Sequence, residues 1–246
     1  MNTNPREHPP ETFWMTGWIP FALLTRDTEF RDLEEYLKTV QEFVRDEGSR
    51  FTKEVEERAR RQDLVGEDAD HFFEAHEQDF ERWHSSFPNT VLSTVLTAAC
   101  SRFESGLTEL CKDLEKERAV ATPITWESFK KQRVQGITRA AHFLNENFGI
   151  NSQLDSRWQD IAAFFKVRDA FVHADGNVFY MGTDNQGKVR AAIQQLKATG
   201  VREAEYGKIE LTAKFFDKLF RSMTGFWIEL RKACRDNAII GPVYWR

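Results

Sequence analysis

The sequence predicts an all-α protein built as an antiparallel helical bundle. Its 246 residues include only 7 prolines and 13 glycines, so few positions interrupt regular elements. Over several long segments, apolar side chains recur at three- and four-residue intervals, which is typical of amphipathic helices. A chain of this length, 41% hydrophobic, can bury a substantial core in one large domain or two small ones.

The first 87 residues are predicted to form an N-terminal arm and a helical addition to the core. Residues 1 to about 12 are polar and contain three prolines, so we expect no regular element there. A helix is expected from about Thr28, and a charged continuation of it reaches Arg61. Leu64–Gly66 then interrupts the helical pattern, and Asp68 is placed to cap the next helix. The apolar face of the first helix consists of Phe30, Leu33, Leu37, Val40 and Val44.

The segment Ser85–Asn89 is the clearest interruption in the chain, because Ser, Pro and Asn cluster there. We therefore expect a second unit at 88–246, which together with 1–87 makes one compact molecule. Three helices are predicted to form its core. They run from the interruption to about Arg118, from a Thr125 cap to Gly149, and from Ser156 to about His173.

After Gly176 the pattern of the chain changes, and a short β-hairpin becomes possible after the third core helix. Val, Phe and Tyr in sequence favour a strand, and Asp-Asn-Gln-Gly favours a turn. The expected elements are a strand at 178–181, a turn at 184–187, a short helix at 188–199, a loop or hairpin return at 200–210, and a long amphipathic helix at 211–235.

Charge and cysteine content restrict the classes of function. A net charge of −5 and a pI near 5.8 argue against a broad basic surface that coats nucleic acid, but they allow a small positive pocket. Three cysteines without paired spacing favour buried thiols in a reducing compartment. With no run of eighteen apolar residues and no apolar leader, we expect a soluble cytoplasmic protein without a membrane partner.

Sequence motifs for cofactors and metals are missing. The chain has no H-E-x-x-H, no cysteine pair at metal-ligand spacing, and none of the common glycine-rich nucleotide or serine-hydrolase motifs. We therefore expect neither a metal site nor a bound cofactor.

The segment 156–173 carries the most informative pattern. Its apolar residues recur at helical spacing, and the next position on that apolar stripe holds Arg168. An arginine cannot lose its proton, so a partly buried one needs an anion, either a protein carboxylate or a bound phosphate. Five residues later comes His173, whose side chain titrates near neutral pH and suits proton transfer. These two residues are our candidate catalytic pair.

The motif Arg168–His173, at a helix end just before Gly176, resembles the R-x4-6-H signature of the HEPN superfamily. The surrounding order is also similar to that of solitary prokaryotic HEPN proteins, over residues 88 to 235. It comprises a Leu-rich helix with Glu104, the motif helix, an isolated segment at 207–211 and a last amphipathic helix. Asp169 stands where many members have asparagine.

The resemblance implies a metal-independent endoribonuclease whose site is shared across a homodimer. Geometry favours the same arrangement, because Arg168 and His173 point about 140° apart on one continuous helix. Asp169, four residues before His173, is predicted to orient the imidazole, and Glu104 to hold Arg168 or the motif in place. The resemblance also implies RNA as the substrate, a role in bacterial toxin, phage-defence or stress responses, and an antitoxin or defence-system partner.

Other interpretations stay open at this point. A structural ion pair with Glu104 or Asp169 would also explain Arg168, and a position at the helix C-terminus, where positive charge is favourable, would also explain His173. The alternative function is a catalytically inactive HEPN-type module that dimerises or binds a partner through its helical face.

Overall fold

The computed structural model describes residues 20–117, 124–131, 136–151 and 156–237, and over these ranges the protein is an all-α helical bundle. The predicted fold class is confirmed. The predicted N-terminal arm at 1–12 lies outside the described residues. The long helices are α1 (Phe21–Arg61), α4 (Phe87–Glu117), α7 (Ser156–Ala174) and α9 (Ala213–Asp236). The shorter helices are α2 (Glu67–Glu74), α3 (Glu77–Glu81), α5 (Trp126–Lys131), α6 (Gly136–Phe148) and α8 (Thr183–Leu196).

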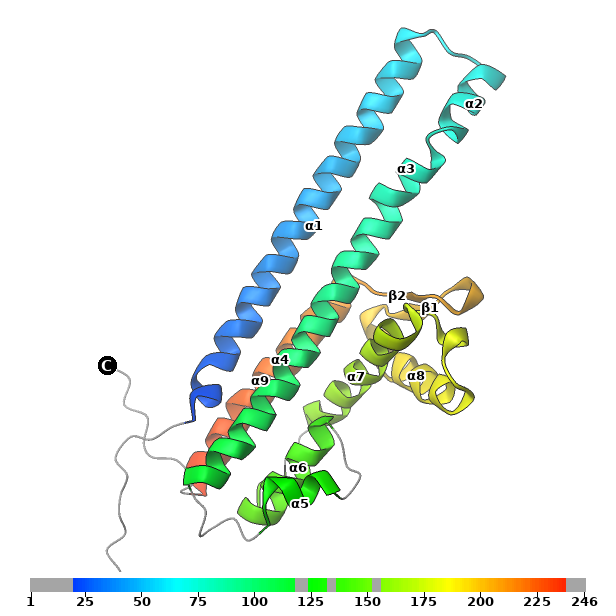
Figure 1. Ribbon diagram of the computed structural model, residues 1–246. Helices are drawn as coiled ribbons and strands as arrows, with labels where there is room; N and C mark the ends of the chain where they lie inside the picture. The colour runs from blue at the N-terminus through cyan, green and yellow to red at the C-terminus, as the bar shows by residue number, and fades with distance from the viewer. Residues whose placement is uncertain (1–19, 118–123, 132–135, 152–155, 238–246) are drawn as a thin grey trace, which may run out of the picture.

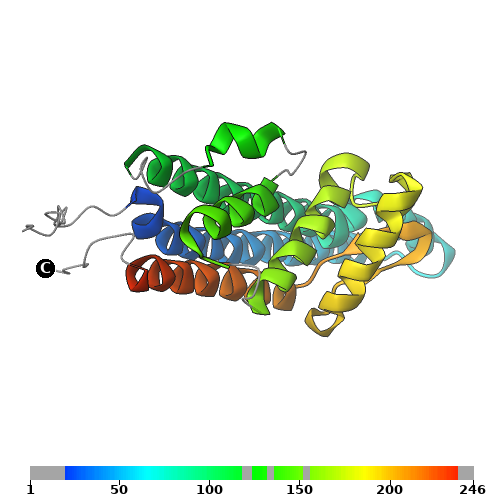
Figure 2. The ribbon, with the colours of Figure 1, turned by 90° about the horizontal axis from the view of Figure 1, so that it is seen from below.

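Helices α1, α4 and α9 lie side by side, with α4 and α9 running in the direction opposite to α1 (Figures 1 and 2). Phe103 of α4 lies at the centre of their packing and is fully buried. Its ring contacts Phe30 of α1, Phe165 of α7, and both Phe226 and Trp227 of α9, with ring centroids 5.3–6.4 Å apart. The N-terminal helix therefore shares one hydrophobic core with the helices that follow residue 87.

The far end of α1 projects beyond this core together with α2 and α3, as Figure 1 shows. We call residues 51–81 the distal extension. Neither α2 nor α3 contains a buried residue, and the surface of α1 there carries the pairs Glu56–Arg60 and Glu57–Arg61. Exposed pairs of this kind contribute little to stability. The distal extension is therefore held mainly by a few apolar contacts such as Phe51 with Phe80 (5.3 Å between ring centroids).

The interruption expected at Ser85–Asn89 is not a loop. A π-helical turn, η1 (Arg82–Ser86), runs directly into α4, and Pro88 is the second residue of that helix. Proline lacks the N–H that a regular α-helix would use at this position, and the π turn just before it accommodates one surplus residue without ending the helix. The Thr90 hydroxyl donates to the Ser86 carbonyl at 2.8 Å and satisfies an acceptor at this junction.

The strand expected at 178–181 is instead a 3-10 turn, η4 (Val178–Tyr180). The Asn177 side chain accepts a hydrogen bond from the Phe179 N–H at 2.9 Å, so a local turn prevails over β propensity. The turn expected at 184–187 is the first part of α8, which starts at Thr183. The loop or hairpin return expected at 200–210 is a short hairpin, in which β1 (Arg202–Glu203) pairs antiparallel with β2 (Ile209–Glu210).

Candidate functional site

Helix α7 positions the candidate motif and is buried on more than one side. Trp158, Ile161, Phe164 and Val167 are all buried, because α4, α8 and α9 pack around the helix. The helix ends as predicted near Gly176, whose φ of 71° lies in the left-handed region. The Gly176 N–H reaches the Ala170 carbonyl at 3.0 Å and closes this end. The last turn of α7, which carries His173, is thereby fixed close to η4 and α8.

Arg168 is mostly buried, with 18% of its side chain exposed, and it faces acids of its own chain. Its Nη2 atom lies 3.7 Å from Oε2 of Glu104 on α4, and its Nε atom lies 3.5 Å from Oδ1 of Asp169. The guanidinium also lies over the Phe165 ring, 5.2 Å from its centroid. These ionic contacts are longer than hydrogen bonds, and the buried Nε has no hydrogen-bond partner. The charge of Arg168 is therefore balanced by two carboxylates, but its Nε–H group makes no hydrogen bond.

Buried Cys100 lies beside this cation. Burial raises the pKa of the Cys100 thiol well above its ordinary value of 9.0, and the smaller effect of the Arg168 charge opposes that shift. The thiol therefore stays protonated at neutral pH and cannot serve as the anion for Arg168. Among the described residues, the carboxylates of Glu104 and Asp169 provide the negative charge next to the Arg168 guanidinium.

Asp169 lies between two cations of the motif helix. Its Oδ1 atom faces Arg168, and its Oδ2 atom lies 3.6 Å from Nζ of Lys166. We predicted that Asp169 orients the His173 ring, but the ionic contacts of its carboxylate are with Lys166 and Arg168. Asp169 and His173 nevertheless line the same surface pocket.

That pocket, which we call the His173 pocket, has a volume of about 280 Å³ and lies between α7, η4 and α8. Lys166, Asp169 and His173 line one wall from α7 at helical spacing, and Lys188 of α8 lines another. The wall between them is completed by Tyr180, Met181, Gly182, Asn185 and Val189. His173 and Lys188 are exposed, so an imidazole and an ammonium group are both accessible to a ligand.

The structure does not bring all four predicted site residues to one place. His173 and Asp169 line the pocket, whereas Arg168 and Glu104 meet against α4, outside the lining residues. Sequence reasoning missed Lys166, although it lies three residues before Asp169 and seven before His173, on the same helix face. It also missed Lys188 and Tyr180, which reach the pocket only because α8 and η4 fold back onto α7.

The described residues form no group of three or more His, Cys, Asp or Glu side chains placed to hold a metal ion. None of the helices they form is long and apolar enough to cross a membrane.

Comparisons of the chain with protein-family models, with curated proteins and with solved structures found no match. The fold and the pocket define an all-α protein with a small surface site that contains His173. The resemblance to HEPN domains stays a prediction.

Proposed function

We propose that this protein is a HEPN-type, metal-independent endoribonuclease that acts as a homodimer. The observation that supports the proposal most directly is the His173 pocket, where an exposed imidazole lies among Lys166, Lys188 and Asp169. With neutral histidine, two ammonium groups and one carboxylate leave this pocket with a net positive charge. An RNA phosphate would therefore be attracted to it, even though the whole chain carries a charge of −5.

The chemistry requires a base, an acid and positive charge. The base takes the proton of a ribose 2′-OH, whose oxygen then attacks the adjacent phosphorus. The acid donates a proton to the departing 5′-oxygen, which leaves a 2′,3′-cyclic phosphate and a 5′-hydroxyl. Positive groups such as Lys166 and Lys188 stabilise the extra charge of the phosphorane as it forms. No step of this reaction needs an oxidant, a reductant or a metal ion.

A single pocket supplies one histidine, which can act as base or as acid but not as both at once. Two copies related by a two-fold axis would supply two imidazoles to one cleft. In support, several apolar side chains are exposed at the end of α7, in η4 and in the turn between β1 and β2, and exposed patches of apolar side chains mark association sites. These side chains are Val172, Phe179, Tyr180 and Tyr206.

In this proposal Arg168 has two roles. In the free protomer Glu104 and Asp169 balance its charge, at distances of 3.5–3.7 Å that leave its hydrogen-bonding capacity incompletely used. When a phosphate group enters a dimeric cleft, the guanidinium offers planar donors that bind two phosphate oxygens together. The resemblance further suggests a toxin, phage-defence or stress role in a bacterium, with an antitoxin or defence-system partner that restrains the nuclease.

The proposal is tested by incubating the purified protein with end-labelled RNA in excess EDTA. We expect cleavage to survive chelation and to leave cyclic phosphate ends. His173→Ala should lower the rate by about 10²–10⁴-fold, as expected when a general acid or base is removed. Lys188→Ala should weaken cleavage less. The matched control is His142→Ala, which removes an exposed histidine of α6 outside the pocket and should leave the rate unchanged.

The second candidate function is a catalytically inactive module that dimerises or binds a partner protein. The burial of Arg168 against Glu104 and Asp169 favours it, because that arrangement also fits a purely structural ion pair. Inert wild-type protein that still forms a dimer in light scattering would support the module and contradict the nuclease. Equal cleavage by wild type and His173→Ala would contradict the assigned site.

A further inference from the structure

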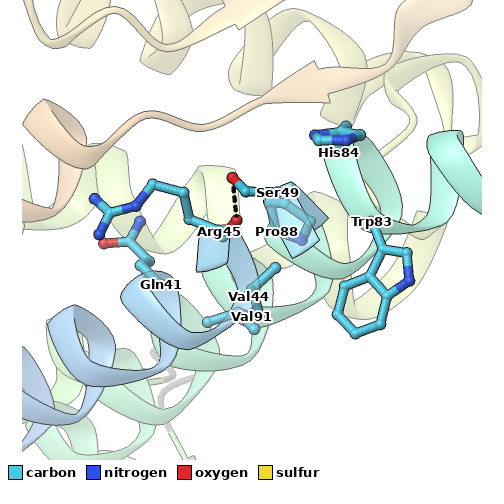
Figure 3. Close-up of a pocket in the computed structure, with 8 residues that line it drawn as sticks. All are labelled: Gln41, Val44, Arg45, Ser49, Trp83, His84, Pro88 and Val91. Atoms are coloured by element: carbon cyan, nitrogen blue, oxygen red, sulfur yellow. Dashed lines mark hydrogen bonds between the residues drawn. The ribbon is translucent and has the colours of Figure 1, made fainter. Parts of the chain in front are cut away.

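A second pocket lies far from the His173 motif in sequence, between α1, the π-helical turn η1 and the start of α4. It has a volume of about 270 Å³ and shares no lining residue with the His173 pocket. We call it the α1–η1 pocket. Its lining residues are Gln41, Val44, Arg45, Ser49, Trp83, His84, Pro88 and Val91, drawn in Figure 3.

The side chains that line this pocket differ from one end to the other. Figure 3 shows Gln41 and Arg45 at one end, Trp83 and His84 at the other, and Val44, Val91 and Pro88 between them. Trp83 is fixed by an edge-to-face contact with Phe87, with ring centroids 4.9 Å apart. A flat ring would therefore meet an apolar, aromatic surface at the Trp83 end, while its polar substituent would face the Arg45 end.

The charge of the lining favours an anion. The lining includes one permanent cation, Arg45, and no carboxylate. The Arg45 partner is the neighbouring Asp46, at 3.3 Å between Nε and Oδ1, and both side chains are about 70% exposed. Such a solvated pair is weak, so Arg45 can exchange it for a carboxylate of a ligand at little cost.

The hydrogen bonds around the pocket determine which atoms remain for a ligand. The Ser49 hydroxyl donates to the Arg45 carbonyl at 2.9 Å, so its oxygen offers lone pairs only. The Thr52 hydroxyl donates to the Gly48 carbonyl at 3.0 Å and so must accept from Nε2 of His84, also at 3.0 Å. In a neutral His84 ring, Nδ1 is then left as an acceptor. The pocket thus presents acceptors suited to a ligand N–H group.

The backbone at this pocket provides an independent indication of a binding site. Trp83 and His84 belong to the π-helical turn Arg82–Ser86, in which one surplus residue changes the direction of the side chains. Short π-helical segments within α-helices occur frequently at functional sites. We propose that the α1–η1 pocket binds a small planar heteroaromatic acid, with its carboxylate at Arg45, its ring against Trp83 and Val91, and a ring N–H toward Ser49 and His84.

The test uses the full-length protein and three probes in calorimetric titrations: indole-3-acetate, indole, which lacks the carboxylate, and naphthalene-1-acetate, which lacks the N–H. Indole-3-acetate should bind at one site per chain. The other two should bind at least about tenfold more weakly, because each loses one specific interaction. No saturable binding of indole-3-acetate, or equal affinity of any two probes, would overturn the proposal.

Variants connect the binding to this pocket. Ser49 is exposed, so Ser49→Phe should fold normally while its ring fills the pocket and abolishes binding. Arg45→Glu should weaken binding by about tenfold or more, whereas Arg31→Glu, the same change at another exposed position of α1, should not. Circular dichroism checks the fold of each variant. Unchanged affinity in both Ser49→Phe and Arg45→Glu would mean that the probe binds elsewhere and would overturn the assignment.

Discussion

At the scale of single residues, Gly106 is a position where α4 approaches its neighbours closely. A Cβ atom at this glycine would lie 2.6 Å from Nε of Arg26 and 2.9 Å from Cζ2 of Trp227. Both neighbours are buried, and Arg26 is held by ion pairs to Glu29 and Glu109. Neither side chain can therefore move away without breaking packing or an ion pair.

We expect Gly106→Ala to lower the free energy of unfolding by about 1–3 kcal/mol, because the overpacking outweighs the gain in helix propensity. Equilibrium denaturation in urea measures the change. The matched control is Gly187→Ala in α8, where a new Cβ meets no atom within 4 Å. That variant should be more stable than wild type by about 0.5–1 kcal/mol. Stabilisation by both substitutions would show that the contact at Gly106 relaxes freely.

Arg168 and Asp169 show what residue identity alone can and cannot predict about a functional site. An arginine on an apolar stripe predicts a nearby anion, and Glu104 and Asp169 both lie within 4 Å of it. The sequence does not decide whether the partner of Arg168 is a protein carboxylate or a phosphate, because either anion balances the charge of the guanidinium. In the free protomer the carboxylates take that place, and the RNA phosphate remains part of the proposal.

At the scale of elements, the start of α9 depends on one side chain. The Thr212 Oγ1 atom accepts from the Phe215 N–H at 3.3 Å and donates to the Thr199 carbonyl at 2.6 Å. It thereby caps the helix and joins it to the 3-10 turn η5 (Lys197–Thr199). Thr212→Ala should lower the free energy of unfolding by about 1–2 kcal/mol, as measured by urea denaturation.

Thr212→Ser is the control for that prediction, because it keeps the hydroxyl and removes only a methyl group. It should restore most of the stability lost in the alanine variant. A serine variant as unstable as the alanine variant would assign the effect to packing of the methyl group rather than to the cap.

Elements with a strong internal period were predictable, and elements defined by their neighbours were not. The apolar periodicity of α4 and α9 specifies a helix locally, because i, i+3 and i+4 contacts lie within one segment. Val178–Met181 has strand-forming residues, but a strand needs a partner along its length. Only one isolated bridge, between Asn177 and Lys208, forms there, and the Asn177 side chain closes a 3-10 turn instead.

At the scale of the whole molecule, stability is distributed unevenly between the core and the distal extension. Phe103 joins α1, α7 and α9 at the core, whereas α2 buries no residue. Local opening is easiest where few apolar contacts must break. We expect the amides of Glu67–Glu74 to exchange with solvent at least about 100-fold faster than the central amides of α4, measured by hydrogen exchange.

Equal protection of α2 and α4 would contradict this prediction and would indicate that the distal extension is covered, for example by a second copy of the chain. Repeating the measurement over a range of protein concentrations distinguishes coverage by a second copy from protection within one chain, since only association depends on concentration.

The sequence by itself determined the all-α class and the end of the motif helix near Gly176, because these follow from local periodicity and backbone preference. It left residues 200–210 open as a loop or a hairpin return. It also singled out Arg168 and His173 as chemically unusual neighbours. Only the tertiary structure decided that Arg168 faces Glu104, while His173 shares a pocket with Lys188 and Tyr180. Those partners lie on other elements, and their approach depends on how whole helices pack, which no local pattern encodes.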